Sequence, residues 1–270
     1  MAEKQEKLKE YLKNLGGLAV AFSGGVDSTY LLYTAHAVLG SRALAVTARS
    51  ATFPVRELDA AVAFCAAAGI EHVICPSDEL AIEGFAYNPP NRCYLCKHNL
   101  FGKIRQIALA YNLPHIADGS NLDDEGDYRP GLTAAAEQGV KSPLRHAGLT
   151  KAEIRELSRR LGLSTWDKPS FACLASRFPY GERITAERLR QIDLSEQFLL
   201  DLGLKQVRVR CHGGAAARLE TDEAGFALLY ERAVREKVYS HLRGLGFAYV
   251  ALDLLGYRSG SMNDTLPPSS

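Results

Sequence analysis

The chain has 270 residues, of which 47% are hydrophobic; this is enough for one large domain or two ordinary ones and argues against a disordered chain. Lysine and arginine number 32 and aspartate and glutamate 31, so the formal net charge of +1 gives no support for a nonspecific nucleic-acid binder. No apolar run approaches the ~20 residues of a membrane span, and the charged first 13 residues lack an apolar signal region. We therefore expect a cytoplasmic protein with no membrane partner and with reduced cysteines.

Hydrophobic periodicity in the first two thirds of the chain alternates between the helical and the strand repeat. A first amphipathic helix ends near Gly16, and strands and helices then follow one another with short links. We expect strands over residues 18–22, 42–47, 71–75 and 115–118, and helices over residues 29–39, 55–68, 98–111 and 150–161. This order predicts an α/β fold with a doubly wound parallel sheet, in which ligands bind outside the carboxyl ends of the strands.

A glycine-rich hexapeptide joins the first expected strand to the helix after it, and its sequence is Ser23-Gly24-Gly25-Val26-Asp27-Ser28. The two glycines allow a tight turn and close approach of the backbone to a ligand. Successive N–H groups at the helix N-terminus, together with the two serine hydroxyls, can bind phosphate oxygens. No Gly-Lys-Ser/Thr follows, so this is not a Walker A loop. The alternative is an ordinary glycine turn, and the hexapeptide in this context predicts a polyphosphate site.

Polar residues also follow two other expected strands. Thr47, at the end of the second strand, is a candidate for contacting the adenosine of a nucleotide. Asp123 and Asp124 follow a Gly-Ser-Asn turn after the strand at 115–118, and their carboxylates are suited to hold Mg²⁺ against phosphates. The alternative for the two aspartates is a solvated acidic loop.

The character of the sequence changes after a long irregular loop over residues 166–183. We expect a helix over residues 186–202, a hairpin of strands over 207–210 and 217–220 around Gly213-Gly214, helical residues over 222–245 and a last strand over 247–254. The chain is therefore divided into a nucleotide-binding domain, residues 1–183, and a small α+β domain, residues 184–270, for substrate binding or oligomerisation.

Three of the six cysteines are candidates for chemistry. Cys93 and Cys96 form a Cys-x-x-Cys pair in a segment expected to be a proline-rich loop, and Cys173 lies in the long loop. Three thiolates suit a 4Fe–4S cluster with one open iron, or zinc with a fourth ligand such as His98, and the sequence does not choose between these metals. The other three are expected to be buried in the core: Cys65, Cys75 and Cys211.

Three motifs in combination point to one family: the hexapeptide at 23–28, the acidic turn at 118–124 with Asp127-Tyr128-Arg129-Pro130-Gly131, and the loop at 168–181. Together they resemble the LarE sulfur transferases of the PP-loop (N-type) ATP pyrophosphatases, over about residues 3–263. The resemblance implies a homo-oligomeric enzyme of nickel-pincer nucleotide cofactor biosynthesis. Such an enzyme adenylates a carboxylate of pyridinium-3,5-biscarboxylic acid mononucleotide with ATP and then installs sulfur as a thiocarboxylate.

The same resemblance identifies Cys173 as the sulfur centre. In members with this cysteine alone, the residue gives up its own sulfur. Because Cys93 and Cys96 are also present, the chain resembles the subgroup whose three cysteines hold a 4Fe–4S cluster with an extra sulfide as the donor. If the thiolate of Cys173 were the nucleophile it would need a lowered pKa, for which Lys168 and Arg177 are nearby cations in the sequence.

A phosphate clamp for the substrate is also implied by the resemblance. Arg208 and Arg210 are two residues apart on an expected strand, so their side chains share one face. With Ser176 and Arg177 they are expected to bind the substrate phosphate, and Glu196 to orient the arginines. The alternative is a solvated basic edge strand.

Three other functions remain open from the sequence. A PP-loop tRNA thiolation enzyme shares the loop, the adenylation and often three cysteines, but the balanced charge argues against an RNA surface. An amide-forming ligase resembling NAD synthetase has no need of the three cysteines. A module that binds ATP without chemistry would release no pyrophosphate.

Overall fold

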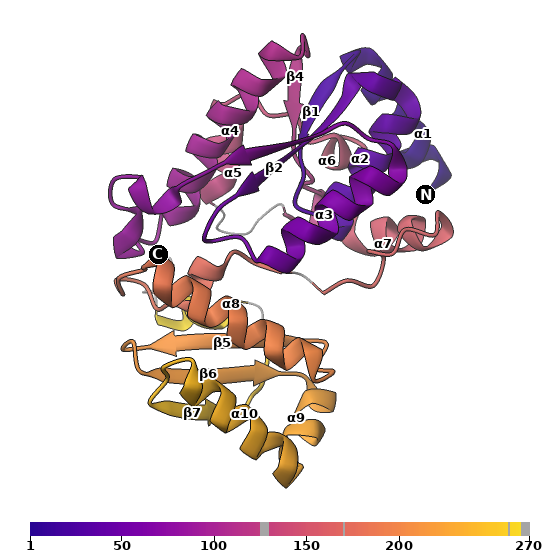
Figure 1. The fold of residues 1–270 in the computed structure, drawn as a ribbon. Coiled ribbons are helices and arrows are strands. Elements are labelled where there is room, and N and C mark those ends of the chain that lie inside the picture. Colours follow the sequence, from indigo (N-terminus) through magenta and orange to yellow (C-terminus); the bar gives the residue numbers. More distant parts are fainter. Residues whose placement is uncertain (125–129, 170, 259, 266–270) are drawn as a thin grey trace. The chain divides into compact units, whose positions relative to one another are not determined.

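The computed structural model describes residues 1–124, 130–169, 171–258 and 260–265, and these form two compact units (Figure 1). The first unit comprises residues 1–77 and 91–171, and the second comprises residues 78–90 and 172–270. This division differs from the predicted boundary after residue 183. The segment at 78–90 joins the second unit because the Asn88 amide donates hydrogen bonds to the Phe178 and Pro179 carbonyls.

A four-stranded sheet is the centre of the first unit, with the strand order β3-β2-β1-β4. The strands are β1 (Leu18–Ala21), β2 (Ala43–Arg49), β3 (His72–Pro76) and β4 (His115–Ala117). All pairs are parallel. The predicted parallel sheet is confirmed, and the carboxyl ends of β1 and β4 lie side by side, as the fold requires for a site at one edge.

Helices cover both faces of this sheet, and two hydrophobic clusters show which face each covers. Leu18 and Val20 of β1 point into a cluster with residues of α1, α2, α3 and α7, whereas Ala19 points into a second cluster with Phe101 and Ile104 of α4. The helices of this unit are α1 (Ala2–Leu15), α2 (Val26–Leu39), α3 (Val55–Ala68), α4 (Arg92–Ala110), α5 (Pro130–Glu137), α6 (Pro143–His146) and α7 (Lys151–Arg160).

The second unit contains a three-stranded sheet in the order β5-β6-β7. Its strands are β5 (Val207–His212), β6 (Ala216–Thr221) and β7 (Tyr249–Leu252), and its helices are α8 (Ala186–Asp201), α9 (Glu223–Tyr230) and α10 (Arg232–Gly244). The predicted hairpin is confirmed: β5 and β6 are antiparallel, with Arg210 opposite Arg218. Gly213 and Gly214 both have positive φ in its turn, where a Cβ would be strained.

The structure differs from the sequence-based expectation in a few local features. The helix expected at 98–111 begins at Arg92, so the Cys-x-x-Cys pair is helical rather than in a loop; the two prolines at 89–90 stop just short of its N-cap, Asn91, and do not interrupt it. The loop at 166–183 contains one 3₁₀ turn, Leu174–Arg177. The helices α5 and α6 were not expected.

The remaining short 3₁₀ turns are Gly40–Arg42, Glu79–Ala81, Phe85–Tyr87, Leu122–Asp124 and Ser261–Thr265. Residues 127–129 of the second family motif and residue 170 of the third lie outside the described residues. Among the described helices, none combines the length and the apolarity of a membrane-crossing segment.

Candidate functional site

The hexapeptide forms a compact loop between β1 and α2. Gly24 has a φ of +67°, and Gly25 is the extended N-cap residue of α2, which has no side-chain cap among the described residues. The Ser28 hydroxyl lies 3.0 Å from the Ser23 hydroxyl and donates to the Gly25 carbonyl at 3.2 Å. The loop is therefore held by its own serines, while the N–H groups of the first helical turn remain uncapped by side chains, as an anion site requires.

A glycine after β4 brings a second turn against this loop. A Cβ on Gly119 would lie 2.9 Å from the backbone nitrogen of Ser28, so only glycine allows this approach. The preceding Asp118 carboxylate is buried and accepts hydrogen bonds from the Ser120 and Ser142 hydroxyls at 2.7 and 2.8 Å. These bonds fix the turn that leads to the two predicted magnesium ligands.

Three carboxylates and one ammonium group cluster beside the start of α2. The Lys151 ammonium forms an ion pair with Asp27, and the Lys151 backbone nitrogen donates to the Asp123 carboxylate at 2.8 Å. The Asp124 carboxylate accepts from the Asn121 backbone nitrogen at 2.9 Å. Burial raises the pKa of Asp27 above its usual value, and the charge of Lys151 opposes the rise. Carboxylate oxygens are the ligands that a hard divalent cation prefers. Among the described residues these three carboxylates do not form a group that could hold a metal ion, so the Mg²⁺ site stays a prediction.

Thr47 has its side chain inside the protein. Its hydroxyl donates to the Phe22 carbonyl at 2.7 Å and lies 2.8 Å from the ring nitrogen Nε2 of His72, whose pKa is lowered by burial. The side chain is 1% exposed. Thr47 lies two residues before the end of β2 rather than at its end, and its contact with adenosine stays a prediction.

Sequence reasoning missed Glu57, in the first turn of α3. Its carboxylate lies 2.6 Å from the Lys168 ammonium, which also donates to the Gly24 carbonyl at 3.0 Å. Acidic residues are common in first helical turns, so nothing in the sequence distinguished this one. The positive charge of Lys168 is thus balanced by a carboxylate.

The candidate metal-binding cysteines are divided between the two units. Cys93 and Cys96 lie three residues apart at the start of α4, hence on one side of the helix, and are exposed and partly buried respectively. Cys173 precedes the 3₁₀ turn of the second unit and is exposed. Within the described ranges, no group of three or more metal-ligating side chains is close enough to hold a metal ion.

The expectation for the other three cysteines is confirmed, since all are buried. Burial raises the pKa of the Cys65 thiol to about 12. A thiol of this kind is protonated at neutral pH and is unsuited to nucleophilic attack.

Arg177 and Glu196 form a fully buried ion pair in the second unit. Two hydrogen bonds join the groups, Nε to Oε1 at 2.7 Å and Nη2 to Oε2 at 3.1 Å. Burial acts to raise the pKa of Glu196, but the charge of Arg177 and its hydrogen bonds hold it below the usual value. Arg177 also donates to the Ala172 carbonyl at 3.1 Å and the Cys173 carbonyl at 3.5 Å, so it supports the backbone that carries the candidate sulfur residue.

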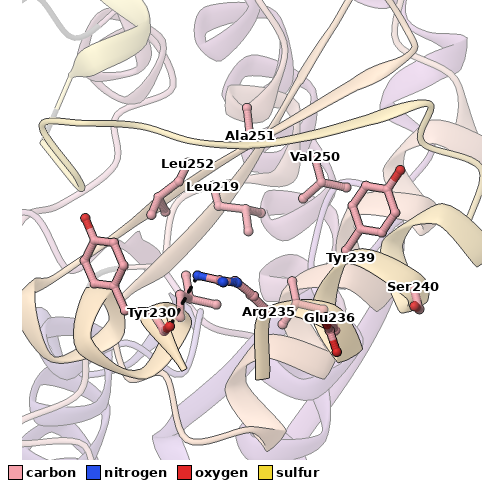
Figure 2. Close-up of a pocket in the computed structure, with 11 residues that line it drawn as sticks. Leu219, Tyr230, Arg235, Glu236, Tyr239, Ser240, Val250, Ala251 and Leu252 are labelled. Atoms are coloured by element: carbon pink, nitrogen blue, oxygen red, sulfur yellow. Dashed lines mark hydrogen bonds between the residues drawn. The ribbon is translucent and has the colours of Figure 1, made fainter. Parts of the chain in front are cut away.

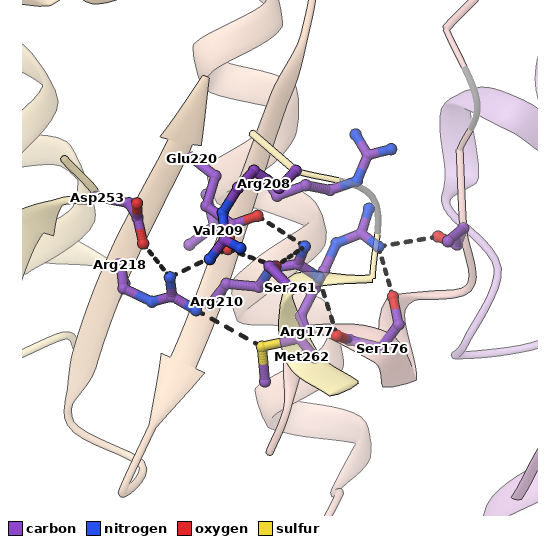
Figure 3. Close-up of polar contacts among 12 residues, drawn as sticks. Ser176, Arg177, Arg208, Val209, Arg210, Arg218, Glu220, Asp253, Ser261 and Met262 are labelled. Atoms are coloured by element: carbon purple, nitrogen blue, oxygen red, sulfur yellow. Dashed lines mark hydrogen bonds and ion pairs between the residues drawn. The ribbon is translucent and has the colours of Figure 1, made fainter. Parts of the chain in front are cut away.

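Arg210 joins this cluster from β5 (Figure 3). Its guanidinium donates to the Glu220 carboxylate at 2.7 Å, the Ser176 carbonyl at 3.0 Å and the Ser261 hydroxyl at 3.1 Å. The neighbouring Arg208 is 2% exposed, and its guanidinium lies 4.9 Å from the ring centre of Tyr257. The strand is therefore not the solvated basic edge that the alternative described.

The cluster carries an excess of positive charge. Arg218 extends it by pairing with Glu220 at 3.2 Å and with Asp253. Burial lowers the pKa of Arg208 to about 10, and the charge of Arg177 adds to this effect. Four guanidinium groups thus face three carboxylates among the described residues: Arg177, Arg208, Arg210 and Arg218 against Glu196, Glu220 and Asp253. An anion of modest charge would balance such a set.

A separate groove of about 470 Å³ lies in the second unit between α9, α10, β6 and β7 (Figure 2). Leu219 and Val238 are among its apolar lining residues, and Figure 2 shows Tyr230 and Tyr239 at opposite sides. None of the predicted site residues lines it. The groove is therefore distinct from the arginine cluster of the same unit.

Three relatives match nearly the whole chain, and no protein-family model matches it. The chain is 39% identical over 269 residues to pyridinium-3,5-bisthiocarboxylic acid mononucleotide synthase of Lactiplantibacillus plantarum. This alignment covers 98% of the present chain and 96% of the synthase. The chain is 41% identical to an uncharacterized protein of Synechocystis, covering 98% and 99%. An uncharacterized protein of Methanocaldococcus jannaschii is 28% identical over 94% of this chain and 96% of its own.

Proposed function

The chain belongs to the LarE family, and from this premise we propose that it is an ATP-dependent sulfurtransferase that converts a carboxylate of pyridinium-3,5-biscarboxylic acid mononucleotide to a thiocarboxylate. The observation that carries the proposal is the 39% identity to the synthase of Lactiplantibacillus plantarum over 98% of the chain. The alignment extends through both units, so it spans the hexapeptide at 23–28, here called the nucleotide loop, and the arginine cluster.

The nucleotide loop supports the first step. A carboxylate is a poor electrophile because its negative charge repels nucleophiles. Adenylation by ATP releases pyrophosphate and attaches AMP to the carboxylate, and AMP is a good leaving group. The uncapped N–H groups at the start of α2 and the glycines at 24–25 suit the departing pyrophosphate. Asp123 and Asp124, with Asp27 beside them, would hold Mg²⁺, which supplies positive charge against the phosphates.

Cys173 is assigned to the second step. Its exposed thiol and the backbone support from Arg177 suit a residue that delivers sulfur. The two cations expected to lower its pKa, Lys168 and Arg177, are each balanced by a glutamate. That balance favours a donor other than a free Cys173 thiolate.

A 4Fe–4S cluster is the donor we propose, and three cysteine thiolates are the set it needs with one iron left open. Cys93 and Cys96 fit two of the ligand positions, being one helical turn apart and accessible, and Cys173 would supply the third. When bound, the cluster supplies a sulfide without consuming the side chain. In the alternative route Cys173 gives up its own sulfur.

The arginine cluster is assigned to the phosphate of the substrate. Its excess positive charge, from Arg208 with Arg177 and Arg210, supports an anion site, and Glu196 orients Arg177 through two hydrogen bonds. Ser176 contributes its carbonyl to Arg210, and its hydroxyl accepts from Arg177 at 2.8 Å.

The test is an anaerobic reaction of the purified protein with ATP, Mg²⁺ and the dicarboxylate mononucleotide. We expect pyrophosphate release that depends on the mononucleotide, and a product in which one oxygen is replaced by sulfur, detected by mass spectrometry. Release that depends instead on tRNA or ammonia would contradict the proposal.

Metal analysis of the same preparation tests the donor. We expect roughly four irons per chain and a brown colour. Colourless protein that has lost one sulfur from Cys173 after turnover would restore the sacrificial route.

A further inference from the structure

The ion pair between Lys168 and Glu57 lies directly against the nucleotide loop. The ammonium is 2.6 Å from the Glu57 carboxylate, and the two side chains are 17% and 6% exposed. Phe171 adds to this environment, with its ring centre 5.9 Å from the same ammonium and 4.9 Å from the guanidinium of Arg56. The pair is thus shielded from water, and its geometry is held more tightly than that of an exposed pair.

The third contact of Lys168 connects the ion pair to the backbone of the nucleotide loop. Its ammonium donates to the carbonyl oxygen of Gly24 at 3.0 Å. That carbonyl and the N–H of Gly25 belong to one planar peptide unit, in which they point in opposite directions. An ammonium that holds the oxygen therefore sets where the Gly25 N–H points.

The Gly24–Gly25 peptide needs such a constraint. Gly24 has a φ of +67° and lacks a side chain, so its backbone is intrinsically mobile. Packing against α3 does not restrain this glycine, since a Cβ placed on Gly24 would lie 3.6 Å from Ala61, which is an ordinary contact distance. The hydrogen bond from the Gly25 nitrogen to the Ser23 hydroxyl is long, at 3.4 Å.

We propose that Lys168, held by Glu57, is a positioning residue that orients the Gly25 N–H toward the polyphosphate of the nucleotide. The charged donor also polarises the peptide, which strengthens its N–H as a donor to phosphate. Glu57 balances the ammonium and fixes its position. The inference rests on the nucleotide-binding half of the proposed function and is independent of the sulfur donor.

The test compares inorganic pyrophosphate with AMP as probes, by isothermal titration calorimetry on the full chain. We expect Lys168→Met to weaken pyrophosphate binding about tenfold to a hundredfold, the range for a lost charge-assisted hydrogen bond, and to leave AMP binding within about twofold. Lys4→Met is the matched control. It removes a lysine that pairs with Glu153 at 2.8 Å in the same unit, and pyrophosphate binding should not change.

A structural role is separated by the double variant Glu57→Gln, Lys168→Met. In Lys168→Met the Glu57 carboxylate keeps only Arg56, at 3.8 Å, and in Glu57→Gln the Lys168 ammonium loses its carboxylate. Both single changes therefore lower the melting temperature, and the double variant recovers part of the loss. Pyrophosphate binding stays weak in the double variant if Lys168 positions the loop. Recovery of binding together with stability, or equal loss for AMP and pyrophosphate, would overturn the proposal.

The NMR chemical shift of the Gly25 amide reports on the orientation of this peptide, and a change in global stability alone does not alter it. We expect it to shift in Lys168→Met and in the double variant but not in Lys4→Met. Wild-type protein that binds pyrophosphate without forming a thiocarboxylate refutes the proposed function and leaves this inference standing. Wild-type protein that does not bind pyrophosphate refutes both.

Discussion

The nucleotide loop of the first unit and the arginine cluster of the second are two candidate anion sites built in opposite ways. The loop offers backbone N–H groups, with its glycines and serines close in sequence. The cluster offers guanidinium groups, which are buried and held by glutamates from other elements. A backbone site depends on local conformation, whereas a side-chain site depends on partners that must be brought together.

The two regions also differ in what holds them. Loss of a single side chain in the loop changes where N–H groups point and leaves few charges exposed. Loss of a single side chain in the cluster leaves an opposite charge buried. We therefore expect mutations in the first region to act mainly on nucleotide binding, and mutations in the second mainly on stability and on substrate binding.

The largest expected effect is that of Cys173→Ala. Thiocarboxylate formation should be abolished, because the sulfur centre is removed, while pyrophosphate release dependent on the mononucleotide continues. Both are measured in one anaerobic reaction. The control is Cys65→Ala, a buried thiol that should retain sulfur transfer. Sulfur transfer by Cys173→Ala would show that the donor lies elsewhere.

The next effect is on stability. Glu196→Ala leaves Arg177 charged, fully buried and without its main partner, so we expect a loss of about 3–5 kcal/mol in the free energy of unfolding. Denaturant titration measures it. The pair of changes Arg177→Met, Glu196→Leu should recover most of that loss. A small effect of Glu196→Ala would mean that water reaches the cluster and that burial of charge does not distinguish it from the loop.

A smaller effect is expected from Gly119→Ala. The added methyl group would lie 2.9 Å from the Ser28 nitrogen, so the loop must shift, at a cost of ~1–3 kcal/mol. We expect nucleotide affinity to fall roughly tenfold, measured by calorimetry. Gly102→Ala is the matched control, because a Cβ on this α4 residue meets nothing within 4 Å. Unchanged affinity for Gly119→Ala would separate the second turn from the nucleotide site.

The smallest expected effect is on the pH dependence of stability. Burial acts to raise the pKa of Glu196, but Arg177 holds it below the usual 4.5. A carboxyl group with a lowered folded-state pKa stabilises the protein at pH values above its unfolded-state pKa. This stabilisation is lost as the pH falls through the folded-state pKa. Glu196→Gln should therefore flatten the decline in stability below about pH 4.5. If the free energy of unfolding of this variant falls with pH as steeply as that of the wild type, other carboxyl groups cause the loss of stability in acid.

Most of the fold was predictable because its signals are local. The helix at 55–68 matches α3 at both ends, and the helix expected from residue 150 is α7, which begins with a capping box of Thr150 and Glu153. The expected start of α4 failed because the prolines at 89–90 were interpreted as part of a loop that extends beyond them. They stop just before the N-cap, a position that helices tolerate.

The candidate site was predictable in part for the same reason. The hexapeptide, the Gly119 turn and the alternation that puts Arg208 and Arg210 on one strand face all depend on neighbours in the chain. Burial of those arginines and the role of Glu57 do not, because each depends on segments far apart in sequence. Nothing in the first turn of α3 indicates a partner more than a hundred residues away.

By itself, the sequence determined most of the helices and strands, where the backbone turns sharply, and the family to which the chain belongs. Only the tertiary structure decided which charges meet: Lys151 with Asp27 across 124 residues, Lys168 with the Gly24 carbonyl across 144, and Arg177 with Glu196 out of reach of water. The physical reason is that backbone conformation is set largely by adjacent residues, whereas an ion pair forms wherever folding removes two opposite charges from water at the same place.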